Sequence, residues 1–345
     1  MRLDDLFHHA VKEKASDLHL VVNLPPIIRV NGNLLHVGEK PISDKEMQTL
    51  ILSILEERQK QIFIEEKELD ISYEVEKLAR FRVNLHWERG NMGLAARIIS
   101  DSIPTLEDLL MPQVVADLTK LQQGLILMTG PTGCGKSTTL ASMIERINNE
   151  SSKNIITLED PIEFIFHPKK SIIRQRQLNT DMLSFGAALK HILRQDPDVV
   201  MVGEMRDLET ISTTITLAET GHLVLATLHT FSAAQTIDRI IDIFPPHQQN
   251  QVRLQLSLTL SGIISQRLIP SLDETLIATR EILINTPAIA NLIRENKVAQ
   301  IKTTIQTGAE DGMITMDQDL KNLYQQNRIS REVAEAAMTN PGALK

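Results

Sequence analysis

The sequence predicts an α/β protein in which a small α+β domain precedes a larger domain built on a parallel β-sheet. Two patterns support this expectation. Apolar and polar residues alternate in several segments before residue 100, which is typical of half-buried strands. From residue 124 onward, short apolar segments alternate with helix-like segments, as buried parallel strands and their crossover helices do. The length of 345 residues also favours two domains, because it exceeds what one ordinary core holds.

The first hundred residues contain signals for two helices and five strands. Helical spacing indicates a first amphipathic helix with the apolar face Leu3, Leu6, Phe7, Ala10 and Val11. Apolar segments 27–30 and 34–37 flank Asn31-Gly32-Asn33, which predicts a hairpin because Asn and Gly accept positive φ. Ser43-Asp44 can cap a second helix, whose apolar face would be Met47, Leu50, Ile51, Ile54 and Leu55. Further strands are expected at 69–75, 79–85 and 93–99.

A linker is expected where the pattern changes. In the segment 101–105, Pro104 resists helix formation and Thr105 can cap a helix that begins after it. We therefore expect a first domain at 1–100, a linker at 101–115 and a second domain at 116–345. Apolar strands of the second domain are expected at 125–129, 155–158, 199–202 and 223–227. After about residue 247 the pattern is nearly all helical, from Gln248–Leu268 to a last helix near Arg331–Met338.

Composition argues against several classes of protein. A net charge of −8 disfavours a general nucleic-acid binder, because neutralising phosphates requires a basic face. The N-terminus lacks the apolar core of a secretory signal, and no apolar run reaches the roughly 20 residues that cross a bilayer. A single cysteine, Cys134, excludes an internal disulfide and a multi-cysteine metal site. We expect a cytoplasmic protein without a transmembrane segment.

The strongest chemical signal is a phosphate-binding loop. Residues Gly130 to Ser137 match G-x-x-x-x-G-K-[ST] between an apolar strand and a helix-forming segment. Glycines let backbone N–H groups point toward phosphates, and the following helix presents its positive end. Lys136 would reach the β- and γ-phosphates, and the Ser137 hydroxyl would bind Mg²⁺. We expect ATP and Mg²⁺ to be bound by Gly130, Pro131, Thr132, Gly133, Cys134, Gly135, Lys136, Ser137 and Thr138.

Hydrolysis also requires a carboxylate near the γ-phosphate. The apolar strand 199–202 leads to Glu204, which is the expected base because Gly203 stands where many P-loop enzymes have Asp. A second acidic cluster follows the preceding apolar strand and comprises Glu159, Asp160 and Glu163, among which the residues alone do not decide. Because carboxyl ends of parallel strands converge on the ligand, both clusters should face the loop.

Two histidines, His222 and His229, bracket the next apolar strand. Near a nucleotide, an imidazole can hydrogen-bond a γ-phosphate or an acidic neighbour and report its loss. The alternative, that both histidines are structural, stays open on the sequence alone.

Four segments together resemble the signature boxes of secretion ATPases: Gly130–Thr139, Ile156–Glu163, Val202–Asp207 and Ala218–Thr230. More narrowly, the chain resembles the PilT family of type IV pilus retraction ATPases, from Ala15-Ser-Asp-Leu-His19 and Leu24-Pro-Pro26 to the segment 288–295. The resemblance implies a PAS-like N-terminal domain, a RecA-like ATPase domain with C-terminal helices, and a ring hexamer. It also implies a motor for pilus retraction and twitching motility that meets a pilus platform protein at the inner membrane.

The resemblance assigns roles to residues outside the loop. By similarity, the further site residues are the catalytic Glu204, the acidic-box Glu163, the histidine-box His229 and His222, and the N-terminal arginines Arg82 and Arg97. An arginine supplied across an interface neutralises developing phosphate charge and makes hydrolysis depend on assembly.

Two positions depart from the family pattern. Position 290 is Ala where Arg is expected, within the segment 288–295 that the family associates with retraction. The apolar spacing of Ile289, Leu292 and Ile293 suits core packing equally well. Cys134 replaces a small hydroxyl or other small residue. A thiol at a helix start should have a lowered pKa, so we hypothesise that alkylation of Cys134 blocks ATP binding.

Four alternative functions remain to be compared. A pilus-assembly or type II secretion ATPase would usually carry a four-cysteine zinc module and a longer N-terminal region. A PilU-like accessory retraction ATPase shares every box, although Met205-Arg206-Asp207 and the segment 288–295 favour the PilT-like side. A RecA-like nucleic-acid translocase should show a basic, aromatic-bearing surface, yet aromatic residues make up only 3%. A nucleotide-gated scaffold without turnover would tolerate the loss of Glu204.

Overall fold

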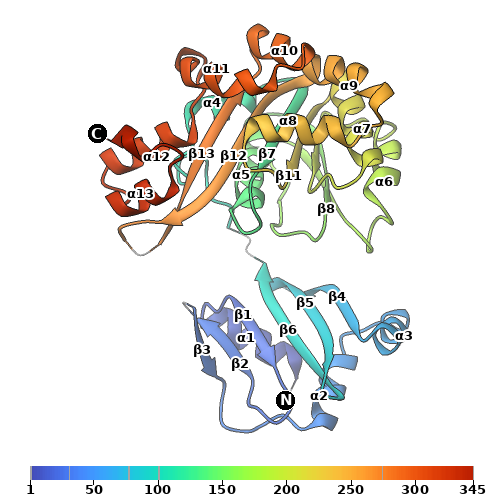
Figure 1. Cartoon of the computed structure of the whole chain (residues 1–345). Coiled ribbons are helices and arrows are strands. Elements are labelled where there is room, and N and C mark those ends of the chain that lie inside the picture. Colours follow the sequence, from blue (N-terminus) through green and yellow to red (C-terminus); the bar gives the residue numbers. More distant parts are fainter. Residues whose placement is uncertain (1, 31, 77, 100–101, 274, 345) are drawn as a thin grey trace. The chain divides into compact units, whose positions relative to one another are not determined.

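The computed structural model describes the whole chain except Met1, Asn31, Lys77, residues 100–101, Glu274 and Lys345. The chain divides into two compact units, one formed mainly by residues 1–102 and the other by residues 103–162 and 166–345 (Figure 1). Each unit has its own β-sheet and its own hydrophobic core. In the described part of the chain, no helix combines the length and apolar character needed to cross a membrane.

The N-terminal unit is a six-stranded antiparallel sheet with the order β3-β2-β1-β6-β5-β4. Its strands are β1 (Asp17–Leu20), β2 (Ile27–Val30), β3 (Asn33–His36), β4 (Glu68–Val75), β5 (Ala79–Glu88) and β6 (Asn91–Ile99). Its helices are α1 (Leu3–Lys12), α2 (Asp44–Leu52) and α3 (Glu57–Glu66). The core joins the helices to one face of the sheet: Phe7 of α1 stacks on Phe81 of β5 with ring centroids 4.1 Å apart.

The elements expected in this unit are present. Ser43 caps α2 by accepting a hydrogen bond from the Glu46 N–H, as its position before the apolar pattern predicted. Strands β2 and β3 pair as a hairpin with Val30 opposite Asn33, while Asn31 of the predicted turn lies outside the described residues. Helix α3 was not predicted, because Phe63 is its only buried residue and leaves no apolar stripe to recognise.

The second unit is a seven-stranded sheet with the order β13-β12-β7-β11-β10-β8-β9. Its strands are β7 (Gly124–Thr129), β8 (Asn154–Glu159), β9 (Ile172–Gln177), β10 (Val199–Val202), β11 (Leu223–Leu228), β12 (Leu260–Pro270) and β13 (Leu276–Ile284). All neighbouring pairs are parallel except β12 and β13. The helices are α4 (Gln113–Leu118), α5 (Lys136–Glu150), α6 (Phe185–Ile192), α7 (Leu208–Glu219), α8 (Ala233–Asp242), α9 (Pro246–Thr259), α10 (Pro287–Arg294), α11 (Ile301–Thr307), α12 (Met316–Gln325) and α13 (Arg331–Ala337).

The expectation of a nearly all-helical region after residue 247 was wrong for two segments. The predicted helix Gln248–Leu268 ends at Thr259, and β12 and β13 follow it before the chain returns to helices (Figure 1). Strand β12 lies between β7 and β13, and Ile263 and Ile264 are both fully buried. A strand buried on both faces has no alternation, so periodicity alone does not distinguish it from a buried helix.

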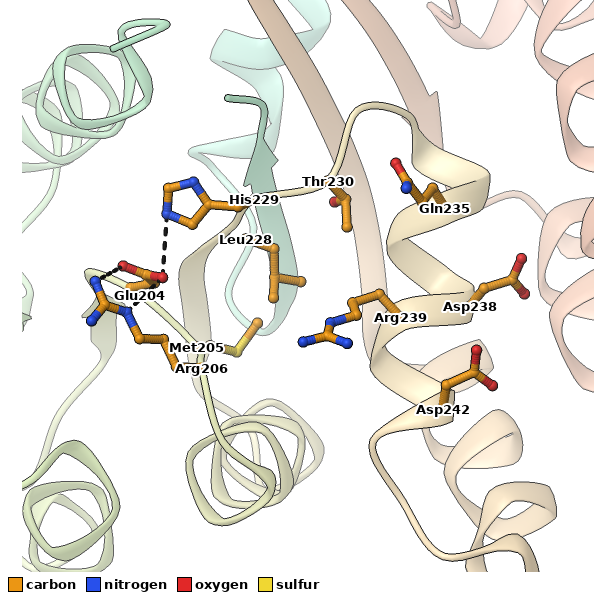
Figure 2. Close-up of a pocket in the computed structure, with 10 residues that line it drawn as sticks. All are labelled: Glu204, Met205, Arg206, Leu228, His229, Thr230, Gln235, Asp238, Arg239 and Asp242. Atoms are coloured by element: carbon orange, nitrogen blue, oxygen red, sulfur yellow. Dashed lines mark hydrogen bonds and ion pairs between the residues drawn. The ribbon is translucent and has the colours of Figure 1, made fainter. Parts of the chain in front are cut away.

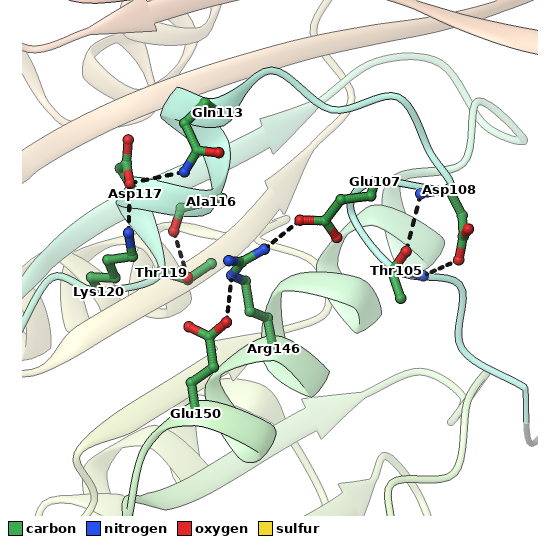
Figure 3. Close-up of polar contacts among 10 residues, drawn as sticks. All are labelled: Thr105, Glu107, Asp108, Gln113, Ala116, Asp117, Thr119, Lys120, Arg146 and Glu150. Carbon is green, nitrogen blue, oxygen red and sulfur yellow. Dashed lines mark hydrogen bonds and ion pairs between the residues drawn. The ribbon is translucent and has the colours of Figure 1, made fainter.

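Most of the segment predicted as the linker 101–115 belongs to the second unit, which begins at Ile103. Thr105 and Asp108 exchange two backbone-to-side-chain hydrogen bonds of 2.9 and 3.0 Å (Figure 3). Glu107 accepts a 2.7 Å bond from Arg146 of α5, which is 39 residues further along the chain. Pairing over such a separation leaves no local signal in the sequence.

Arg280 of β13 also binds this segment, through the main chain of Leu109 and Leu110. Replacing Arg280 tests how much these hydrogen bonds contribute to stability. Arg280 is 3% exposed and donates to the main-chain carbonyls of Leu109 and Leu110. Arg280→Met leaves both carbonyls without this donor, so we expect the free energy of unfolding to fall by about 2 kcal/mol. Urea unfolding measures this change, with Arg294→Met on the exposed side of α10 as the control. A loss below about 0.5 kcal/mol, the range of surface substitutions, would contradict the anchoring role.

Candidate nucleotide site

The loop between β7 and α5 has a backbone that only glycine accommodates at several points. Gly130, Gly133 and Gly135 have φ values of 143°, 77° and 84°. A Cβ on Gly130 would lie 2.2 Å from the Gln266 carbonyl oxygen, so space as well as φ requires glycine there. Lys136 begins α5 and donates to the carbonyls of Gly130 and Pro131 at 2.8 and 2.9 Å. The loop therefore encloses its lysine at the positive end of α5, an arrangement suited to phosphate.

The other candidate groups reach this loop because the strands that carry them are parallel and in register. Thr129 of β7 lies opposite Leu228 of β11, and Val202 of β10 lies opposite Ala226. The residues that follow these strands therefore leave the sheet at one edge. Gly203 donates to the Leu158 carbonyl at 2.7 Å, and Met205 donates to the Thr227 carbonyl at 3.1 Å. Both neighbours of Glu204 are thus held by the main chain of adjacent strands.

Four side chains form a continuous polar chain across this edge. Lys136 Nζ lies 3.5 Å from His229 Nδ1, and His229 Nε2 lies 3.2 Å from Glu204 Oε1. Arg206 contacts both carboxylate oxygens of Glu204, each at 2.7 Å (Figure 2). With His229 neutral, Nδ1 accepts from Lys136 while Nε2–H donates to Glu204, so one tautomer satisfies both contacts. A cavity of about 540 Å³ opens beside these residues toward Asp238 and Arg239 of α8.

The environment of Glu204 keeps its carboxyl group ionised. Burial by itself raises the pKa of Glu204, but the hydrogen bond from Arg206, the charge of Arg206 and the neighbouring His229 together outweigh it. The pKa of Glu204 therefore lies below its ordinary value. The ionised Glu204 carboxylate is connected to Lys136 of the loop through the imidazole of His229. Such a carboxylate can accept a proton from a water molecule.

The second acidic cluster contains one buried carboxylate and two exposed ones. Glu159 is buried, and its carboxylate accepts from Thr157 at 2.6 Å and from Gln175 at 3.0 Å. Asp160 and Glu163 are exposed in the loop that follows β8. Glu159 thus supports the strand end internally, and the exposed pair remains accessible to a ligand.

The two histidines occupy opposite edges of the sheet, which corrects the expectation that both lie near the nucleotide. His222 precedes β11, and its Nδ1 lies 3.0 Å from the Leu217 carbonyl and 3.1 Å from the Thr220 hydroxyl. His229 follows β11 and contacts Lys136 and Glu204. Residues at the two ends of a strand necessarily lie on opposite edges, so only His229 joins this chain's loop.

The loop fits Mg²⁺ and nucleotide by its donor set. Ser137 occupies the first turn of α5 beside Lys136, which places one hydroxyl oxygen at the phosphate end of the helix. Mg²⁺ commonly takes one or two protein ligands and completes its shell with water and phosphate oxygens. The described residues contain no group of three or more His, Cys, Asp or Glu side chains that could hold a metal ion. A Mg²⁺ ion at this loop would therefore depend on Ser137, phosphate oxygens and water.

Arg82 and Arg97 belong to a row of charged residues across the N-terminal sheet. Arg97 of β6 lies directly opposite Arg82 of β5 and also opposite Asp17 of β1, which pairs with Arg29 of β2. Arg97 Nε binds Asp17 Oδ1 at 2.9 Å, yet the Arg97 side chain remains 70% exposed. Like charges directly opposite each other in a sheet are unfavourable. The row contains three arginines and one aspartate and therefore carries net positive charge.

Sequence reasoning missed two residues of the site. The run Met205-Arg206-Asp207 does not by itself assign a role to Arg206, although its position two residues after Glu204 allows a local ion pair. Gln266 of β12 donates to the Cys134 carbonyl and accepts from the Thr139 hydroxyl, and it lay within a segment predicted to be helical. Contacts that span more than a hundred residues had no signal in the sequence.

The chain is similar to known proteins along nearly its whole length. A family model described as type II/IV secretion system protein matches residues 2–343. The chain is 47% identical over 334 residues to the type IV pilus retraction ATPase PilT of Pseudomonas aeruginosa, with 97% of each chain covered. It is 40% identical over 346 residues to the type IV pilus ATPase PilU of the same organism, covering 100% of this chain and 91% of PilU. A crystal structure of the pilus retraction motor PilT with bound ADP superposes with a TM-score of 0.93 at 44% identity, covering 100% and 99% of the two chains.

The environment of Cys134 contradicts the expectation of a reactive thiol. Cys134 is 3% exposed, and its sulfur lies under Gly130, where a Cβ would approach Sγ to 2.6 Å. Burial raises the pKa of the Cys134 thiol and outweighs the charge of Lys136. The helix start was expected to lower this pKa, but the side chain turns into the protein.

Cys134 should therefore react slowly. We expect its reaction with a disulfide reagent at neutral pH to be at least about tenfold slower in the folded protein than in urea, because only the accessible thiolate attacks. Release of the chromogenic thiol gives both rates on the same sample. Equal rates in the two conditions would show that the thiol is exposed in solution.

Proposed function

This chain belongs to the type II/IV secretion system protein family, and we propose that it is an ATP-hydrolysing motor of type IV pilus retraction. The observation that carries the proposal is the polar chain Lys136–His229–Glu204, which connects the phosphate-binding loop to an ionised carboxylate. The likeness to PilT along nearly the whole chain supports retraction as the work that hydrolysis performs.

Each residue of the loop has a role that its position supports. Backbone N–H groups of the loop residues between Gly130 and Thr138, except Pro131, would hold the phosphates, and Ser137 would provide the protein ligand to Mg²⁺. The bound ion would neutralise phosphate charge. Lys136, which contacts loop carbonyls here, would redirect its ammonium group to the β- and γ-phosphates. His229 touches Lys136 and Glu204, so movement of the lysine changes the hydrogen bonds of the base.

Glu204 acts as the general base in this proposal. It accepts the proton of the attacking water while Arg206 and His229 hold its carboxylate charged and oriented. The exposed Glu163 would complete the acidic side of the site, as the family resemblance implies. His222 lies too far from this loop for a role there, so any role in catalysis would act on a neighbouring copy.

A complete site requires more than one copy of the chain. Arg82 and Arg97 lie opposite each other on the N-terminal unit, in a row that carries net positive charge. We propose that this face serves the loop of a neighbouring copy in a ring hexamer, where the arginines neutralise developing phosphate charge. Nucleotide then drives movement of a PAS-like domain, residues 1–100, against a RecA-like ATPase domain, residues 116–345, by binding one arrangement more tightly. A pilus platform protein would receive this movement.

An accessory retraction ATPase is the second candidate, supported by the likeness to PilU. The segment 288–295 bears on this choice. Ile289 and Ile293 of α10 are fully buried, so part of the retraction motif packs in the core. Asn291, Arg294 and Glu295 are exposed and remain available to a partner, whereas Ala290 offers no charge. Restoration of twitching in cells that lack the principal motor would separate the two roles.

Replacement of Glu204 tests the catalytic assignment. Glu204→Gln keeps the shape of the side chain but cannot accept a proton, so we expect ATP hydrolysis to fall by about 10²-fold or more while Mg-ADP still binds. Phosphate release and calorimetric titration measure the two quantities. Glu310→Gln, an exposed residue near the C-terminal helices, is the control. Hydrolysis at the native rate in Glu204→Gln would support a nucleotide-gated scaffold or another base.

Mixing two inactive variants tests whether sites are shared between copies. In a mixture of Arg97→Gln and Glu204→Gln chains, some sites combine a native Arg97 with a native Glu204. We expect such mixtures to recover part of the native ATPase rate, because the two residues come from different copies. The specific activity of the native protein, measured per mole of chain, should also rise with protein concentration as the oligomer forms. Mixtures no more active than the separate variants, together with constant specific activity, would mean that each chain carries a complete site.

A further inference from the structure

A buried amide side chain of strand β12 contacts the phosphate-binding loop. Gln266 is 2% exposed, and both the nitrogen and the oxygen of its side-chain amide form hydrogen bonds. Its Nε2 donates to the main-chain carbonyl of Cys134 at 2.6 Å, in the middle of the loop. Its Oε1 accepts from the hydroxyl of Thr139, a buried residue in the first turn of α5, at 3.1 Å. One side chain therefore connects the loop, the helix that follows it and the neighbouring strand.

Two loop glycines leave room for this residue. A Cβ on Gly130 would lie 2.2 Å from the main-chain oxygen of Gln266, and a Cβ on Gly135 would lie 2.9 Å from its Nε2. A Cβ on Gly133 would meet no atom within 4 Å, so its glycine serves backbone conformation alone. The outer glycines of the motif thus combine positive φ with close approach to Gln266.

Strand β12 is itself fixed to the strand that leads into the loop. Ser265 pairs in register with Thr129, the last residue of β7, and their hydroxyl groups are 2.8 Å apart and buried. The position of Gln266, the next residue of β12, is therefore set relative to the first residue of the loop. A short buried contact of this kind limits how far the loop moves relative to the sheet.

The bond to the Cys134 carbonyl has a consequence for the Gly135 N–H. In a trans peptide the C=O and the following N–H point in opposite directions. A Cys134 carbonyl directed at Gln266 turns the Gly135 N–H away from β12. We propose that Gln266 is a positioning residue that holds the Cys134–Gly135 peptide in the orientation that phosphate binding requires. This inference rests on the proposed nucleotide-binding function of the loop.

Three variants of the full-length protein test the proposal by their affinity for Mg-ADP. Gln266→Met keeps an unbranched side chain of similar volume and removes both hydrogen bonds, and we expect the dissociation constant to rise about tenfold. Gln266→Glu can accept from Thr139 but cannot donate to the Cys134 carbonyl, so it should not restore affinity. Thr139→Val removes the other partner and should weaken binding about threefold. Gln306→Met, at an exposed glutamine of α11, is the matched control.

The double variant Gln266→Met with Thr139→Val should bind no more weakly than Gln266→Met, because both changes remove the same contact. Urea unfolding establishes which variants are folded. If Gln266→Met does not fold, Thr139→Val and Gln266→Glu carry the test. Folded variants that bind Mg-ADP within twofold of the native protein, with only a lower unfolding midpoint, would show a purely structural role and overturn the proposal. A native chain that binds no Mg-ADP would overturn the proposed function as well.

Discussion

Parallel strand pairing in register is the constraint on which the candidate site depends. Thr129, Val202 and Leu228 end three adjacent strands at one edge of the sheet, so the loop, Glu204 and His229 emerge side by side. Main-chain bonds from Gly203 and Met205 to the neighbouring strands then leave the Glu204 backbone little freedom. The distances within the polar chain follow from this backbone, because side chains of fixed length connect positions that the sheet has already set.

Electrostatics within that geometry favours one protonation state. Glu204 is partly buried, which by itself favours the neutral acid, yet the adjacent Arg206 and His229 reverse this preference. The bidentate contact from Arg206 also orients the carboxylate. His229 joins this carboxylate to the lysine of the loop, so the position of Lys136 and the hydrogen bonding of the base are coupled through one imidazole. A ligand that moves Lys136 would therefore change the hydrogen bonds of Glu204.

The N-terminal unit contains an arrangement that its own stability does not explain. Arg82 and Arg97 face each other across neighbouring strands, and in the described part of the chain Arg97 and Arg29 share one ion-pair partner, Asp17. Repulsion between paired arginines is tolerated where the charge has a use, and a phosphate group on a neighbouring copy would provide one. The phosphate-binding loop and these arginines lie in separate compact units, each with its own core. The proposed site would combine them by assembly of several copies.

The sequence by itself determined the features that depend on local chemistry. The glycine pattern and Lys136 identified the loop, the apolar runs identified four parallel strands, and Ser43 identified a helix start, because each depends on neighbouring residues. Tertiary structure alone decided the rest. Strand β12 had the apolar character of a helix or a buried strand, and only its place between β7 and β13 settled which. The burial of Cys134 and the contacts of Gln266 arise from packing between segments far apart in the chain, where sequence patterns carry no information.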